Sequence, residues 1–340
     1  MSQNNQHRLH SLPLCYFLKS YSVSYRDKTA IIDGVTEDII TYGQLYHRIA
    51  KIAWWLDQNG IQQGDRVACI SLNSKAYIEF YLALAWIGGV AVPLNIRHNP
   101  KELSIIIQDS RAKAMFSDSQ FVENAEAALT QGSFEGLKIL CGRPKAGWTA
   151  YDSLIHDDND TLEMNKDVTG ETLMLLLYTS GTTGKPKGCM LGQRSWTAQA
   201  ADLAASRKMG CDDTYLSFMP LFHVSGFSAT FSQLILGGTV ITAPMPDPKF
   251  LWGLAEKYKA TIANFIPTVS IPFVQHHASE QAESSSLKIF ISGAGAEPRE
   301  LVDYVERKMG GTEYCRLQKA ALYRICGYHS KERFRKDSKE

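Results

Sequence analysis

The sequence lacks an imbalance of charge. Its 340 residues carry 36 Lys and Arg against 35 Asp and Glu, so the formal net charge is +1. A chain this close to neutral has no overall attraction to nucleic acid or to an anionic membrane, and we expect neither as a partner. Glycine (25) and proline (12) are near background, which excludes collagen-like and low-complexity chains. A hydrophobic content of 44% excludes an intrinsically disordered chain.

The sequence also lacks paired cysteines. No two of them form a C-x-x-C motif, and no histidines complete a zinc-binding spacing. An odd, scattered set argues against the disulfide framework of a small secreted protein. It predicts reduced thiols in a cytoplasmic protein. The seven cysteines are at positions 15, 69, 141, 189, 211, 315 and 326.

No hydrophobic run is long enough to cross a membrane. The most apolar stretch, residues 80–96, has 17 residues without a charge and is interrupted by Gly88, Gly89 and Pro93. This pattern predicts a helix followed by a buried strand instead of a span. Residues 1–20 are polar and have no continuous apolar core, so we expect no signal peptide there.

Predicted strands and helices alternate along the chain. Leu45, Ile49 and Leu56 recur at helical spacing, which predicts a helix with Gly60 as its C-cap. The alternation with short turns predicts a mostly parallel α/β fold. A polar, acidic stretch at 151–170 predicts a subdomain boundary. The other predicted helices are 75–88 and 101–110, and the predicted strands are 66–72, 89–94, 114–117, 172–178, 214–219, 239–242, 261–265 and 287–292.

The most informative segment is residues 178–188, YTSGTTGKPKG. Gly181 and Gly184 can adopt positive φ, so successive backbone N–H groups can converge on one cluster of oxygen atoms. Hydroxyl groups add donors, and two lysines add the positive charge that a triphosphate needs when pyrophosphate leaves. The candidate phosphate-binding residues are Thr179, Ser180, Gly181, Thr182, Thr183, Gly184 and Lys187.

Two common phosphate-binding loops are excluded by this segment. A Walker A motif requires Ser or Thr after Gly-Lys, whereas Pro186 follows Lys185 here. The G-x-G-x-x-G spacing of a dinucleotide-binding loop is also not met. On composition alone, a surface turn rich in Ser, Thr and Gly remains the alternative.

Small residues follow another predicted strand, at Gly293, Ala294 and Gly295. The ends of parallel strands face the ligand crevice of an α/β sheet. Small side chains there allow a flat purine or an acyl chain to lie against the backbone. The alternative is an ordinary turn between a strand and a helix.

The loop YTSGTTGKPKG closely resembles the signature loop of the adenylate-forming enzymes, which include acyl-CoA synthetases, luciferases and nonribosomal adenylation domains. Further segments resemble later motifs of this family in the right order, and the resemblance covers about residues 15–311. They are LSFMPLFHVSGF (216–227), NFIPTVSIPFV (264–274) and KIFISGAGAEP (288–298).

The resemblance implies an α/β fold with two stacked αβα subdomains, which form the large N-terminal domain over residues 12–311. It places the site at the junction of the subdomains. It also implies that His223, in PLFHVSGF, lines the acyl and adenylate pocket with Gly293, Ala294 and Gly295. The alternative for His223 is a partly buried side chain that only packs.

Residues 312–340 depart from the family. They hold eight Lys or Arg and four Asp or Glu, a net charge of +4. The Tyr-Gly-x-Thr-Glu motif, whose Glu helps to hold Mg²⁺ in the family, is not recognisable there. Neither is the small C-terminal domain with its catalytic lysine. We therefore interpret 312–340 as an aberrant basic tail after a truncation or a frameshift.

The resemblance implies an ATP-dependent enzyme that activates a small carboxylic acid as an acyl-adenylate and transfers the acyl group to coenzyme A, with Mg²⁺ assisting. Because of the departure at 312–340, we expect this activity to be weak or absent in this chain. The first alternative is a non-catalytic nucleotide-binding remnant. The second is an adenylation domain that serves a separate carrier protein. Neither the acid nor the oligomeric state is predicted.

Overall fold

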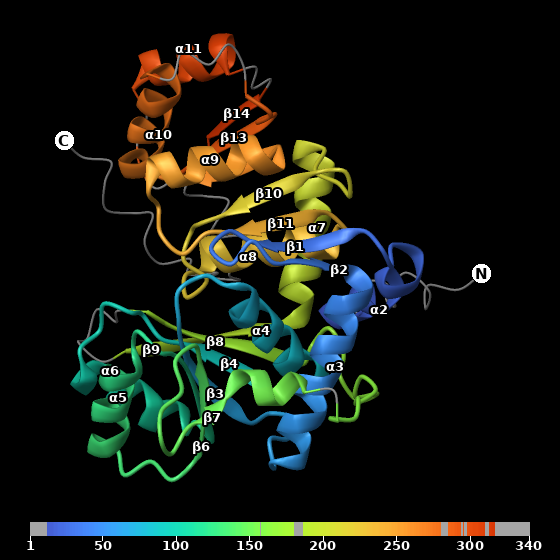
Figure 1. Cartoon of the computed structure of the whole chain (residues 1–340), viewed down its shortest axis with the longest axis vertical. Coiled ribbons are helices and arrows are strands. Elements are labelled where there is room, and N and C mark those ends of the chain that lie inside the picture. Colours follow the sequence, from blue (N-terminus) through green and yellow to red (C-terminus); the bar gives the residue numbers. More distant parts are fainter. Residues whose placement is uncertain are drawn as a thin grey trace, which may run out of the picture.

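The protein folds into two seven-stranded sheets with helices between and around them (Figure 1). The computed structural model describes residues 12–156, 158–179, 186–279, 285–293, 295, 298–309 and 313–316. Both sheets are mostly parallel and are connected through helices, so the predicted fold class is confirmed. Figure 1 shows the first sheet above and the second sheet below, with α4 and α8 between them.

The first sheet has the strand order β14-β13-β12-β10-β11-β1-β2. Its strands run parallel except for β2, which pairs antiparallel with β1. The core strands β11, β12 and β13 are buried along their whole length, as expected for a sheet covered on both faces. The bounds are β1 (Thr29–Asp33), β2 (Ile39–Thr41), β10 (Thr214–Ser217), β11 (Thr239–Thr242), β12 (Ile262–Phe265), β13 (Ile289–Ser292) and β14 (Glu313–Arg316).

The second sheet has the order β7-β6-β5-β3-β4-β8-β9 and is parallel except for β9, which returns antiparallel along β8. The predicted boundary stretch 151–170 lies between β7 and β8, which belong to this same sheet. It remains a prediction as a domain boundary. The bounds are β3 (Arg66–Ile70), β4 (Val90–Pro93), β5 (Ala114–Asp118), β6 (Leu137–Cys141), β7 (Thr149–Ala150), β8 (Leu173–Thr179) and β9 (Lys187–Gly192).

Some of the helices, α3, α4, α5 and α9, begin at a residue whose side chain caps the first turn. Thr41 and Gln44 form a capping box at α3, and Asn99 and Glu102 form one at α5. The bounds are α2 (Leu14–Ser24), α3 (Tyr42–Gln58), α4 (Lys75–Ile87), α5 (Pro100–Ser110), α6 (Val122–Gln131), η1 (Tyr151–Ile155), α7 (Gln193–Arg207), α8 (Val224–Ile235), α9 (Pro248–Tyr258), α10 (Pro267–Ser279) and α11 (Arg299–Lys308).

Helix α4 forms the centre of the main hydrophobic core. All of its residues after Lys75 are buried, because the helix lies between the sheets and contacts strands of both. The predicted helix and buried strand at 80–96 are therefore confirmed as α4 and β4. Gly60 is not itself a C-cap, since α3 ends at Gln58 and Asn59 caps it. Gly60 follows with φ 81°, the left-handed conformation that reverses the chain. In the described part of the chain, no helix combines the length and the hydropathy needed to cross a membrane.

Candidate active site

A cavity of about 540 Å³ lies where the carboxyl ends of strands from the two sheets meet. The second sheet contributes the end of β4 and the β8–β9 hairpin, and α5 forms one wall. The first sheet contributes the segment that follows β10. Ligands of open α/β sheets bind at this edge. The lining residues are Pro93, Asn95, His98, Glu102, Ile105, Ile106, Tyr178, Thr179, Pro186, Phe222 and His223.

The cavity has an apolar and a polar side. Ile105, Ile106 and Phe222 give it an apolar surface, and Ile105 is 44% exposed although it is a large aliphatic residue. His98 and His223 supply imidazole groups that can donate or accept hydrogen bonds. A mostly apolar cavity with a few polar groups is the usual form of a small-molecule site.

The described residues that flank the signature loop, Tyr178, Thr179 and Pro186, line this cavity. Thr179 ends β8, Lys187 begins β9, and the two residues are directly opposite each other in the antiparallel pair. Both are exposed. The structure therefore brings together the first and the last of the predicted phosphate-binding residues. The others lie outside the described residues, and their role remains a prediction: Ser180, Gly181, Thr182, Thr183 and Gly184.

His223 stands immediately before α8, in extended conformation. Its backbone N–H donates to the carbonyl of Pro220 (3.0 Å), and its carbonyl accepts from the N–H of Phe227 (3.0 Å). Its ring lies 4.7 Å from the ring of Phe222 between centroids. Partial burial lowers the pKa of His223, and the positive charge of Arg97 and the neighbouring His98 lower it further. The neutral imidazole is therefore favoured near pH 7.

We expect NMR titration of the His223 ring to give a midpoint below the ordinary histidine value of about 6.5. Because the folded pKa is depressed, the unfolded chain takes up the proton first as the pH falls. The contribution of His223 to stability is then full above about pH 6.5 and is lost as the pH falls through the folded pKa. Arg97→Ala should raise the midpoint, and His223→Gln assigns the resonance. A midpoint at or above 6.5 would contradict this account.

Asn73, which the sequence analysis did not single out, fixes the segment that leads to His223. Its side-chain oxygen accepts from the N–H of Leu221 (2.9 Å), and its amide donates to the carbonyls of Met219 (2.8 Å) and Ser217 (3.3 Å). Asn73 follows β3 of the second sheet and is 4% exposed, so these bonds join the two sheets beside the cavity. No local pattern could have revealed it, because its partners are over 140 residues away.

The small residues after β13 are placed at a strand end as predicted, but away from this cavity lining. The N–H of Gly293 donates to the carbonyl of Phe265 (3.1 Å). A Cβ at Gly295 would lie 2.8 Å from Cγ of Pro267, so the backbone approaches that proline closely. Ala294 lies outside the described residues. Among those that are described, neither glycine lines the 540 Å³ cavity, and their place in an adenylate pocket remains a prediction.

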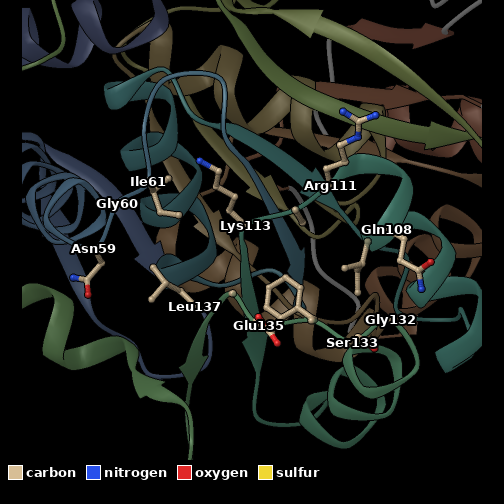
Figure 2. A pocket seen from close by; sticks show the side chains of 14 residues that line it. Asn59, Gly60, Ile61, Gln108, Arg111, Lys113, Gly132, Ser133, Glu135 and Leu137 are labelled. Carbon is tan, nitrogen blue, oxygen red and sulfur yellow. The ribbon is translucent and has the colours of Figure 1, made fainter.

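A second cavity of about 540 Å³ lies at the opposite edge of the second sheet (Figure 2). It is formed by the segments that lead into β3, β5 and β6, including Gly60, Lys113 and Leu137. None of the predicted site residues lines it. The amino ends of parallel strands are not where ligands of this architecture bind, so we assign the candidate site to the first cavity.

The described residues form no group of three or more His, Cys, Asp or Glu side chains that could hold a metal ion. Glu102 is a carboxylate in the cavity lining, but it accepts a hydrogen bond from the N–H of Asn99 (2.9 Å) within the capping box of α5. A single carboxylate with this role does not make an all-protein Mg²⁺ site.

Comparison with known proteins identifies the family of this chain. A family model described as AMP-binding enzyme matches residues 19–319. The chain is 28% identical over 296 residues to indoleacetate–CoA ligase from Aromatoleum aromaticum, covering 85% of this chain and 58% of that protein. It is 30% identical over 295 residues to feruloyl-CoA synthase from Amycolatopsis sp, covering 86% and 57%. The chain thus spans less than two thirds of the length of these relatives.

Solved structures show the same fold. The N-terminal domain of FACL13 from Mycobacterium tuberculosis matches with a TM-score of 0.78 and 24% identity, covering 87% of this chain and 73% of that one. A long-chain-fatty-acid–CoA ligase from Archaeoglobus fulgidus matches with a TM-score of 0.78 and 23% identity, covering 90% and 62%. At these identities the match establishes the architecture of the two sheets and no more.

Proposed function

Because this chain belongs to the AMP-binding enzyme family, we propose that its 540 Å³ cavity is the site where a carboxylic acid is activated by ATP. One observation supports this most strongly. The β8–β9 hairpin brings Thr179 and Lys187 together beside the cavity that also holds His223. Phosphate-binding groups, a neutral imidazole and an apolar wall are then within one site.

In the proposed reaction, a carboxylate oxygen of the acid attacks the α-phosphorus of ATP. The bond to the bridging oxygen breaks, and pyrophosphate leaves with that electron pair. The sulfur of coenzyme A then attacks the acyl carbon, which forms the thioester and releases AMP, while the thiol proton is lost to solvent. The protein must mainly position anions and stabilise developing charge.

The residues of this chain have separate parts in the proposal. Lys187 and the hydroxyl of Thr179 hold phosphate oxygens through charge-assisted hydrogen bonds. Neutral His223 can donate a hydrogen bond to the carboxylate of the acid. Because the neutral ring carries no positive charge, it does not weaken the carboxylate as a nucleophile. Asn73 positions the backbone on which His223 depends. Mg²⁺ would neutralise charge on the phosphates when it accompanies ATP, and we assign no protein ligand to it.

The names of the relatives guide the choice of acids to test. The curated relatives are named for indoleacetate and ferulate, and the A. fulgidus structure is named for a long-chain fatty acid. The apolar wall of Ile105, Ile106 and Phe222 suits either an aryl group or an alkyl chain. The test panel should therefore contain aromatic acids and fatty acids of graded length.

The proposal is tested by measuring ATP binding by calorimetry and acid-dependent exchange of labelled pyrophosphate into ATP. We expect ATP binding in the wild-type chain and, because of the departure at 312–340, at most weak exchange. Lys187→Met should weaken ATP binding about tenfold or more, since a hydrogen bond to a charged group contributes about 1.5–3 kcal/mol. Lys249→Met, which alters an exposed lysine of α9, should leave binding unchanged.

The possible outcomes separate the candidate functions. ATP binding without exchange for any acid would favour a non-catalytic nucleotide-binding protein. Exchange without thioester formation in the presence of coenzyme A would favour an adenylation domain that serves a separate carrier protein. Equal ATP binding by Lys187→Met and the wild type would refute the phosphate-binding role of the hairpin.

A further inference from the structure

The β8–β9 hairpin extends beyond the sheet that carries it. Strand β8 is paired with β4 at Leu175 opposite Ala91, and β4 ends at Pro93, which has no N–H to donate. Because β4 ends only two residues after Ala91, the end of β8 at Tyr178 and Thr179 is paired with β9. A two-stranded ribbon is marginally stable by itself. The position of Thr179 and Lys187 at the end of the ribbon therefore depends on what the ribbon packs against.

The ribbon packs against α5 through Tyr178. The Tyr178 hydroxyl donates a hydrogen bond of 2.5 Å to Oδ2 of Asp109, in the last turn of α5. The Tyr178 ring also packs against the hydrophobic cluster that contains Ile106 and Ile107 of the same helix. Burial and the Asp109 carboxylate raise the pKa of Tyr178, so the hydroxyl keeps its proton and remains the donor.

The contact between Tyr178 and Asp109 joins two elements that line the cavity, β8 and α5. Tyr178 immediately precedes Thr179, the first residue of the phosphate-binding set, and both line the cavity. Ile105 and Ile106 of α5 line the same cavity. The hydrogen bond to Asp109 therefore joins a strand and a helix that both line the cavity.

We infer that Tyr178 and Asp109 form a positioning pair, which holds the phosphate-binding hairpin against α5 and so determines the affinity of the site for the phosphate groups of ATP. This inference rests on the proposed function. Neither residue needs to touch the nucleotide. The pair acts through Thr179 and the loop that follows it, and a loose ribbon would lose binding free energy in ordering the loop.

The test is calorimetric titration of ATP into the full chain. Tyr178→Phe keeps the ring and removes the hydroxyl, and it should weaken ATP binding about tenfold. Asp109→Ala should have the same effect. Asp109→Asn keeps an acceptor oxygen at the same place and should restore binding to within about threefold of the wild type. Tyr16→Phe, at a tyrosine that is 47% exposed, is the matched control and should bind as the wild type does.

The double variant Tyr178→Phe/Asp109→Ala separates positioning from general damage. If the two residues act through one hydrogen bond, the double variant should bind ATP no more weakly than either single variant. Thermal unfolding of each variant is recorded in parallel, and the midpoint of Asp109→Asn should match the wild type. If Tyr178→Phe does not fold, the comparison of Asp109→Ala with Asp109→Asn carries the test.

The results also distinguish this inference from the proposed function. If the wild-type chain does not bind ATP, both the proposed function and this inference are refuted. If the wild type binds ATP and Tyr178→Phe binds equally well, only the inference is overturned. Equal loss of affinity in Asp109→Asn and Asp109→Ala would overturn it as well, because an acceptor oxygen would then have no effect.

Discussion

Glu79→Ala is expected to lower the free energy of unfolding by about 3 kcal/mol, because it leaves the partly buried guanidinium of Arg48 and the buried hydroxyl of Tyr151 without their partner. Glu79 lies on α4 and is 0% exposed, although its neighbours are almost all apolar. Its carboxylate accepts hydrogen bonds from Nε (2.5 Å) and Nη2 (2.9 Å) of Arg48 on α3, and from the hydroxyl of Tyr151 in η1 (2.5 Å). One carboxylate therefore joins three elements.

The matched control is an acidic residue whose ion pair is exposed. Glu171 pairs with Arg194 at 2.8 Å, but both side chains are more than half exposed. Surface pairs contribute about 0–1 kcal/mol, so Glu171→Ala should be nearly neutral. Equilibrium unfolding in urea measures both variants. If Glu79→Ala lies within about 1 kcal/mol of the control, the buried ion pair does not stabilise the fold as argued.

Gly226→Ala is expected to damage the site more than any single side-chain truncation in the cavity. Gly226 lies in the first turn of α8, and a Cβ there would lie 2.2 Å from the carbonyl oxygen of Met219 and 2.3 Å from that of Pro220. Both obstacles are backbone atoms, so no rotamer change relieves the contact. The backbone that must move is the segment that Asn73 holds and that leads to His223.

We expect Gly226→Ala to destabilise the fold by about 1–3 kcal/mol, as overpacking does, and to lower acid-dependent pyrophosphate exchange at least tenfold. Gly253→Ala is the control, since Gly253 is also in a helix but a Cβ there would meet nothing within 4 Å. That substitution should be neutral or stabilising by up to about 1 kcal/mol. If the two variants behave alike in urea unfolding and in exchange, the close approach at Gly226 has no consequence.

Much of the fold could be predicted because its signals are local. The apolar spacing of α3 and the buried run of α4 and β4 are properties of consecutive residues. The signature loop is also continuous, so its position after a buried strand and its resemblance to one family needed no tertiary information, whereas the strand that follows it, β9, was not predicted. Such a loop can be recognised in the sequence because the backbone of one short segment supplies most of the phosphate-binding groups.

Other features are decided by residues far apart in the chain. Glu79 falls within the predicted helix 75–88, where nothing singles it out, and only the structure shows that it joins Arg48 and Tyr151. The partners of Asn73 and of Tyr178 lie 148 and 69 residues away. No local spacing relates such positions.

By itself, the sequence determined the α/β class, several of the strands and helices, and the family, because hydrophobic periodicity and a contiguous loop are properties of neighbouring residues. The tertiary structure alone decided that β1 joins the sheet of β10–β14, that β8 lies beside β4, and which side chains surround the cavity. The physical reason is that strand order and the walls of a site arise when apolar faces of distant segments are buried against each other. The sequence of one segment does not reveal which other segment will cover its apolar face.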